Sequence, residues 1–195
     1  MREDEKQGFS KYLSYLLRHH PESIGLFMMD NGWVNTQELL DALNESKKCD
    51  SFITLDDLIN VVETDTKERY SFYEIDDNPY YAIRANQGHS IKGLKMEYAL
   101  AKEPPRYLYH GTSPKAYENI LSSGGLKPMN RQMVHLSRDK EIAYQVGKRH
   151  SKEAEPVILR IDVLKVFADG KCIYVSDNGV YLMDKVDLDY IQKEE

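Results

Sequence analysis

A short stretch near the start of the chain, residues 9–21, limits the local fold more than any other. Its apolar residues recur at three- and four-residue spacing: Phe9, Leu13, Leu16 and Leu17. This spacing predicts an amphipathic helix that buries one face. Pro21 has no backbone N–H and disfavours helical geometry at the residue before it, so the helix is expected to end at His20.

The last turn of this helix carries a fixed cation, Arg18, beside a titratable group, His19. Positive charge at a helix C-terminus interacts favourably with the helix dipole, and this structural interpretation accounts for the stretch taken alone. The alternative is that Arg18 and His19 belong to a functional site. Only the rest of the chain can decide between the two.

The composition is that of a globular protein with one large domain or two small ones. The chain has 195 residues, of which 41% are hydrophobic and 30% charged. No apolar run approaches the roughly 18 residues that span a membrane, and no apolar segment follows the N-terminus as in a signal peptide. Cys49 and Cys172 are too few for a disulfide framework, so we expect a cytoplasmic protein. We also expect a monomer.

The charge is distributed unevenly along the chain, whose net charge is −6. Residues 1–103 hold 12 basic and 19 acidic residues, whereas residues 104–195 hold 14 and 13. A nucleic-acid partner would therefore need a local cationic pocket on an acidic body. This favours recognition of a small phosphate-bearing feature over attraction to a whole duplex.

Signals for helices and a hairpin follow in the first half. Asn35 and Thr54 can each cap a helix with an apolar stripe. Residues 67–75 alternate and are rich in aromatic residues, and residues 80–85 return as a second strand after a turn at 76–79. Three helices followed by a β-hairpin is the order of a winged helix, a fold that often binds nucleic acid.

Short strands dominate the second half, beyond a segment containing Pro104-Pro105 that we predict to be a linker. Helices are expected from Ser113-Pro114 and over residues 139–150. Strands are expected at five places: 107–109, 134–137, 157–163, 172–175 and 180–182. Many short strands with few helices favour an α+β fold around a small pair of sheets.

Several common catalytic motifs are absent from the sequence. It has no Gly-Lys-Ser/Thr phosphate loop, no Gly-x-Gly-x-x-Gly after a strand and no His-Glu-x-x-His, and no metal is expected. Cations and small polar groups remain at the ends of predicted elements. Each arginine alone is typical of a solvated surface, but several guanidinium groups together would suit a dense cluster of phosphate oxygens.

Six blocks of sequence, in order, resemble one enzyme family. They are residues 13–19 (LSYLLRH), 67–70 (KERY), 83–91 (IRANQGHSI), 108–112 (LYHGT), 129–137 (MNRQMVHLS) and 178–182 (NGVYL). On these blocks the chain resembles RNA 2′-phosphotransferases of the KptA type over nearly its whole length. That resemblance implies an N-terminal winged-helix RNA-binding lobe (1–95), a linker (96–106) and a C-terminal lobe with the ADP-ribosyltransferase fold and a small split β-sheet (107–195), with NAD lying between.

The resemblance also implies a reaction and its residues. In the family, the RNA 2′-phosphate attacks C1″ of the nicotinamide ribose of NAD, and nicotinamide leaves. The ribose 2″-hydroxyl then attacks the phosphorus, which frees the RNA 2′-hydroxyl and gives ADP-ribose 1″,2″-cyclic phosphate. The expected catalytic set is Arg18, His19, Arg69 and Arg131. Our hypothesis is that Arg69 and Arg131 clamp the 2′-phosphate with help from Arg18, and that His19 acts in the second step.

The remaining expected sites concern the two substrates. The residues that resemble NAD-binding positions are His110, Gly111, Thr112, His135, Leu136, Ser137 and Val180. Gly111 is expected to let the nicotinamide amide approach the backbone, and Val180 stands where many transferases of this fold carry a glutamate. The residues expected to bind a tRNA-like RNA and its phosphate are Lys67, Asn86, Gln87, Gly88, His89 and Ser90.

The sequence leaves two other functions open. One is an ADP-ribosyltransferase that caps terminal phosphates of nucleic acids, which would use the first step without the second. The other is a non-catalytic winged-helix RNA-binding protein with a second domain that has lost its activity. Retention of all four residues of the catalytic set argues against the latter.

Overall fold

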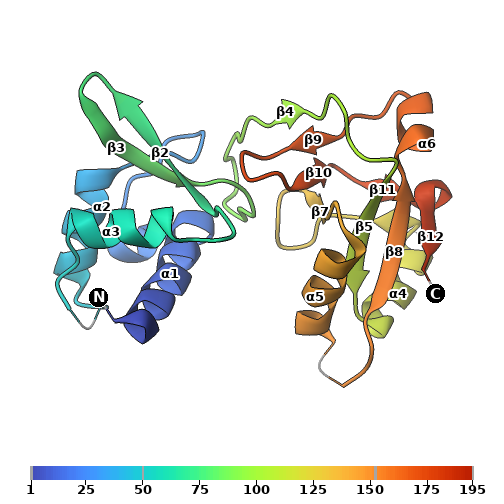
Figure 1. Cartoon of the computed structure of the whole chain (residues 1–195), viewed down its shortest axis with the longest axis horizontal. Helices are drawn as coiled ribbons and strands as arrows, with labels where there is room; N and C mark the ends of the chain where they lie inside the picture. Colours follow the sequence, from blue (N-terminus) through green and yellow to red (C-terminus); the bar gives the residue numbers. More distant parts are fainter. Residues whose placement is uncertain (1, 50, 152, 195) are drawn as a thin grey trace. The chain divides into compact units, whose positions relative to one another are not determined.

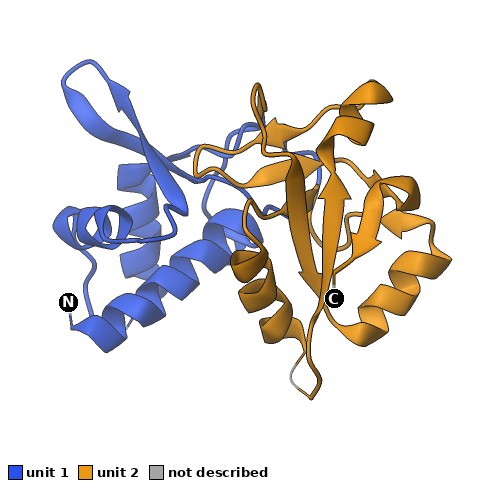
Figure 2. Cartoon of the chain, turned by 45° about the vertical axis from the view of Figure 1, so that its right-hand side comes forward, with its two compact units in different colours: residues 1–97 blue, residues 98–195 orange. Residues whose placement is uncertain are grey.

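The structure is a computed structural model that describes residues 2–49, 51–151 and 153–194. It consists of two compact units, residues 1–97 and 98–195 (Figures 1 and 2). Helices and several small antiparallel sheets occur in the chain, which confirms the predicted α+β class. Within the described ranges, no helix is long and apolar enough to cross a membrane.

The described residues of unit 1 form three α-helices and a three-stranded antiparallel sheet. Its elements are α1 (Glu3–Arg18), η1 (Pro21–Ile24), β1 (Val34–Asn35), α2 (Thr36–Ser46), α3 (Leu55–Glu63), β2 (Tyr70–Ile75) and β3 (Asn78–Ala85). The strand order is β1-β3-β2. The predicted caps are confirmed: the Asn35 side chain accepts a hydrogen bond from Glu38 N, and Thr54 accepts one from Asp57 N.

Two boundaries in unit 1 differ from the prediction. Helix α1 ends at Arg18 rather than His20, and a 3-10 helix then begins at Pro21. The hairpin turn is shorter than expected, because Asn78 and Pro79 already belong to β3 and only two residues separate the strands. Pro79 is tolerated at the start of that strand because Ile75 pairs with Asn78 and the ladder shifts next to it.

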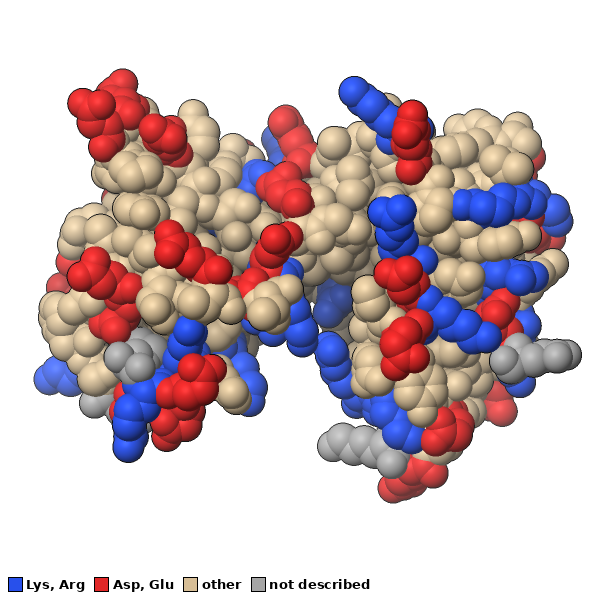
Figure 3. Space-filling model, in the orientation of Figure 1, with Lys and Arg blue, Asp and Glu red and all other residues tan. Residues whose placement is uncertain are grey.

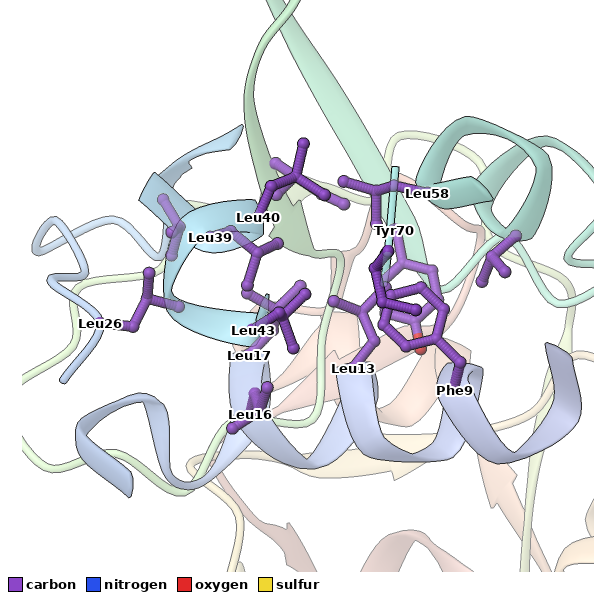
Figure 4. Close-up of a cluster of buried hydrophobic side chains, with 14 of the residues drawn as sticks. Phe9, Leu13, Leu16, Leu17, Leu26, Leu39, Leu40, Leu43, Leu58 and Tyr70 are labelled. Atoms are coloured by element: carbon purple, nitrogen blue, oxygen red, sulfur yellow. The ribbon is translucent and has the colours of Figure 1, made fainter. Parts of the chain in front are cut away.

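The core of unit 1 forms where α1 packs against the other helices and the sheet. Figure 4 shows Phe9, Leu13 and Leu17 pointing from α1 toward the labelled side chains of α2, α3 and β2. Leu13, Leu16 and Leu17 are fully buried, as the apolar periodicity predicts. Burying a leucine side chain contributes about 2 kcal/mol, so this stripe fixes the orientation of α1 and of its C-terminal residues.

Over its described residues, unit 2 is built from short strands, three α-helices and a 3-10 helix. Its elements are β4 (Ala99–Leu100), β5 (Tyr107–Thr112), α4 (Pro114–Ser122), β6 (Gly125–Leu126), β7 (Val134–Leu136), α5 (Lys140–His150), β8 (Val157–Asp162), α6 (Val163–Ala168), β9 (Tyr174–Val175), β10 (Tyr181–Met183), β11 (Val186–Asp187), η2 (Leu188–Tyr190) and β12 (Ile191–Lys193). The segment expected to be a linker, 96–106, contains β4, which pairs with β9.

Two of the sheets in unit 2 meet at a single point. One sheet has the order β12-β8-β5 and the other β4-β9-β10-β7, and both are antiparallel. An isolated bridge between Tyr109 of β5 and Ser137, just after β7, joins them. Tyr109 N donates to Ser137 O at 2.8 Å, and Ser137 N donates to Tyr109 O at 2.7 Å. Side chains from two different sheets are therefore brought to one place.

Candidate active site

The end of α1 is tied to the polar segment 86–90. The His19 Nδ1 and Ser90 Oγ atoms are 2.8 Å apart, and Ser90 N donates a hydrogen bond to Arg18 O at 2.9 Å. Gly88 has a φ of 93°, and a Cβ atom there would lie 3.5 Å from Arg18 Cδ. The glycine thus allows a left-handed turn directly against the Arg18 side chain.

His89 is an uncharged group at the centre of this segment. Its side chain is 1% exposed, and neither ring nitrogen has a hydrogen-bond partner among the described residues. Burial lowers the pKa of His89 to about 3, and the charges of Arg18, Arg84 and His19 act in the same direction. His89 is therefore neutral at physiological pH and supplies no positive charge for a phosphate.

Asn86 holds the backbone that carries Arg69. Its Nδ2 donates to Glu68 O at 2.8 Å, its Oδ1 accepts from Ser71 Oγ at 2.7 Å, and its backbone N donates to Arg69 O at 2.8 Å. Asn86 is 3% exposed, and Glu68 has a φ of 46° that a side chain rarely adopts. The amide of Asn86 is thus used to fix this strained turn next to Arg69.

The guanidinium group of Arg69 is oriented by Asp65. Arg69 Nη1 donates to Asp65 Oδ1 at 2.6 Å and reaches Ser10 Oγ at 3.5 Å. The Asp65 side chain is only 7% exposed and that of Arg69 28%. Because a guanidinium group has five N–H donors in a fixed fork, it can hold a buried carboxylate and bind an anion with its other donors.

Arg18 and Arg69 both lie near the Tyr70 hydroxyl in unit 1. Burial raises the pKa of the Tyr70 hydroxyl, whereas the charges of Arg18 and Arg69 both act to lower it. That hydroxyl donates to Ser10 O at 2.6 Å. Unit 1 therefore gathers two guanidinium groups near one buried phenol, and His19 follows Arg18 at the end of α1. Gln87 is half-buried and Lys67 exposed in the same region of the chain.

In unit 2, the predicted NAD-binding positions gather where the two sheets meet. The His110 Nδ1 atom lies 3.0 Å from His135 O, and His135 Nδ1 lies 3.0 Å from Met133 O. Val180 directly precedes β10, whose first residue, Tyr181, pairs with Leu136. Val180 N donates to Ser176 Oγ at 3.1 Å, which fixes the turn that leads into that strand.

Arg131 lies near His110. It is on the loop before β7, and the residue is exposed. Partial desolvation nevertheless lowers the pKa of its guanidinium group. Burial lowers the pKa of His110, a hydrogen bond to His135 O opposes this, and the charges of His150 and Arg131 lower it further. His110 is therefore neutral, with a cation close to it.

Gly111 packs closely against α5. A Cβ atom on Gly111 would lie 1.7 Å from Ala143 O and 2.8 Å from Gly147 N, both on the backbone of α5. The absence of a side chain is thus required for α5 to pack on β5, and this packing alone is enough to require a glycine. Thr112, the next residue, is also buried.

The structure adds two residues that the motifs did not single out, Asp65 and Ser10, both in contact with Arg69. Asp65 lies in a polar connection and Ser10 within a helix, so neither has a local sequence signal. The described residues include no group of three or more histidine, cysteine, aspartate or glutamate side chains that could hold a metal ion.

Comparison with known proteins gives one consistent result. A family model described as "RNA 2′-phosphotransferase, Tpt1 / KptA family" matches residues 3–185. The chain is 44% identical over 195 residues to a "Probable RNA 2′-phosphotransferase" of Trichormus variabilis, covering 98% of each chain. Proteins with the same description are 43% identical in Nostoc punctiforme, over 94% of each chain, and 42% identical in Flavobacterium johnsoniae, over 98% of each chain.

Proposed function

Because this chain belongs to the RNA 2′-phosphotransferase (Tpt1/KptA) family, we propose that it removes an internal 2′-phosphate from RNA by transferring it to NAD. The products are RNA with a free 2′-hydroxyl, nicotinamide and ADP-ribose 1″,2″-cyclic phosphate. The observation that carries this proposal is the grouping of Arg18 and Arg69 near the Tyr70 hydroxyl in unit 1, with His19 next to Arg18 at the end of α1.

Unit 1 is proposed to be a winged-helix lobe that binds the RNA. Its three helices and antiparallel hairpin, with β1 as a short third strand, support this. Arg69 and Arg18 would bind the 2′-phosphate, which is already an anion and needs orientation rather than a strong base. The hydrogen bond between His19 and Ser90 would hold the imidazole in position to act on the 2″-hydroxyl or on the transferred phosphate.

Unit 2 is proposed to be an ADP-ribosyltransferase-like lobe that binds NAD. The meeting point of its two sheets supplies a neutral imidazole, His110, and the hydroxyl of Ser137, and Arg131 offers a cation close by. His110 and Ser137 fit the polar sugars of a dinucleotide, and Arg131 would hold the 2′-phosphate that reacts with it. Val180 leaves the 2″-hydroxyl without a carboxylate partner there, as suits a hydroxyl that must become a nucleophile.

The test is to incubate the protein with NAD and an RNA that bears one internal 2′-phosphate. We expect loss of that phosphate and appearance of the cyclic phosphate product, detected by mass spectrometry. The same RNA without the 2′-phosphate is the control. A stable ADP-ribose cap on an RNA with terminal phosphates would instead identify a capping enzyme, and RNA binding without release of nicotinamide would identify a non-catalytic protein.

A further inference from the structure

One side of α1 in unit 1 borders a groove of about 480 Å³, with the connection from α3 to β2 as its other wall. The residues of α1 that line it include Glu3, Gln7, Ser10 and Ser14, at the three- and four-residue spacing of one helix face. From the opposite wall come Thr64, Thr66 and Lys67, among others. Its volume is within the range of sites that hold small ligands.

The groove is basic although unit 1 is acidic. Residues 1–97 contain 11 basic and 18 acidic residues. Four of these basic residues line the groove, Lys6, Lys11, Lys67 and Arg69, against two acidic ones, Glu3 and Asp65. Asp65 already accepts hydrogen bonds from Arg69. A polyanion near unit 1 would therefore be attracted to this groove more than to the surrounding surface.

The groove leads to the proposed phosphate-binding residues. Arg69 is part of its lining. Ser14 lines the groove too, and Arg18 follows it by four residues on the same face of α1. A strand that placed its 2′-phosphate on Arg18 and Arg69 could therefore continue along α1 toward Lys11 and Lys6.

Other surfaces of unit 1 suit a phosphate chain less well. The turn of the β2–β3 hairpin is covered by acidic side chains (Figure 3, upper left), which come from Glu74, Asp76 and Asp77. A second groove, of about 340 Å³, is lined by two basic residues, Arg2 and Lys48, and two acidic ones, Asp4 and Glu5. Neither surface has the excess of positive charge of the groove along α1.

We propose that this groove binds the sugar-phosphate backbone of the single-stranded RNA that flanks the 2′-phosphate. The inference rests on the proposed function, because it needs an RNA substrate at Arg18 and Arg69. Lysine ammonium groups and the hydroxyls of Ser10, Ser14 and Thr66 would contact the phosphates. None of the described residues that line the groove is aromatic, so bases have no ring to stack on there and the contact is with the sugar-phosphate backbone.

The experiment compares two doubly substituted chains of equal charge. Lys6→Gln/Lys11→Gln neutralises the groove, and Lys47→Asn/Lys48→Gln neutralises two lysines outside it. Lys47 has a φ of 52°, which asparagine tolerates. Binding is measured by fluorescence anisotropy without NAD, on a 2′-phosphorylated dinucleotide and on octanucleotides extended from it on the 5′ side or the 3′ side. Thermal unfolding checks that each variant is folded.

We expect the groove variant to bind one of the two octanucleotides about five- to tenfold more weakly and the dinucleotide less than twofold more weakly. The slope of log affinity against log salt should fall by about 1.4, since each phosphate contact on a single strand contributes about 0.7. The control variant should match the wild type. Unchanged octanucleotide affinity in the groove variant, or no gain from extension in the wild type, overturns the proposal.

The same substrates separate this inference from the proposed function. If the wild type binds the octanucleotide through the groove but does not remove the phosphate from any substrate when NAD is added, the proposed function is wrong and the groove is retained. If it removes the phosphate from all of these substrates and binds the dinucleotide and the octanucleotides with equal affinity, the function stands and the groove proposal is rejected.

Discussion

Asp65 holds Arg69 at two points: its carboxylate accepts a hydrogen bond from Arg69 N at 2.7 Å and another from Arg69 Nη1 at 2.6 Å. Arg69 donates both bonds to this one residue, which lies four positions earlier in the chain. The backbone and the guanidinium group of Arg69 are therefore fixed relative to each other. Asn86 fixes the same turn from the other side through Glu68 and Ser71.

The first prediction concerns this pair. Asp65→Asn removes the charge that orients Arg69, and a catalytic group displaced by about 1 Å can lose up to about a hundredfold in rate. We expect the rate constant for phosphate removal to fall at least tenfold while KM for RNA changes less. Asp57→Asn is the matched control, because it weakens the cap of α3 without contacting Arg69. Equal loss of activity in both variants would mean that Asp65 acts through stability alone.

A second prediction separates the two steps of the proposed reaction. If the guanidinium groups of Arg69 and Arg131 mainly hold the phosphate while charge redistributes in the second step, Arg69→Ala and Arg131→Ala should accumulate ADP-ribosylated RNA. Single-turnover reactions with labelled RNA, resolved on gels, would reveal it. Arg149→Ala, at the exposed end of α5, serves as the control. Slow reactions that show no intermediate would contradict this division of roles.

Local signals in the sequence predicted much of unit 1. The apolar stripe of α1, the caps at Asn35 and Thr54 and the alternation of the hairpin each depend on residues within a few positions of one another. The same signals predicted that Arg18 and His19 end a helix, since Pro21 follows. Strands of two residues, such as β6 and β11, have no periodicity, and only pairing with each other defines them.

The details of the candidate site depend on contacts between distant positions. Nothing near Asn86 in sequence indicates that its amide holds Glu68 and Ser71, 18 and 15 residues away. His89, expected to bind RNA or phosphate, is buried beside Arg18, which follows from packing and not from its polarity. Gly111 likewise owes its identity to α5, which begins nearly 30 residues later.

The third prediction is a pH dependence of stability that comes from His89. Its pKa is about 3 in the folded chain and near 6.5 when unfolded, so the unfolded state alone binds this proton between those values. The contribution of neutral His89 to the free energy of unfolding is therefore present above pH 6.5 and is lost as the pH is lowered toward 3. The titration of His89 should lower the free energy of unfolding by about 2 kcal/mol from pH 7 to pH 5.

Urea denaturation of the wild type and of His89→Asn, at pH 7 and pH 5, measures this contribution. Whatever the stability of the variant at each pH, its loss of stability on acidification should be smaller than that of the wild type. Carboxylates titrate equally in both chains, so the difference isolates the imidazole. Identical losses would show that His89 is protonated in the folded chain.

The last prediction uses two glycines that differ in their surroundings. Gly111→Ala would place a methyl group 1.7 Å from Ala143 O, and because that atom belongs to the backbone of α5, the strand and helix must separate. We expect unit 2 to lose about 3 kcal/mol or more of its free energy of unfolding. Gly8→Ala meets no atom within 4 Å and lies inside α1, so it should stabilise unit 1 by about 0.5–1 kcal/mol. Calorimetry on both variants measures these changes, and a Gly111→Ala chain as stable as the wild type would contradict the close packing of α5 on β5.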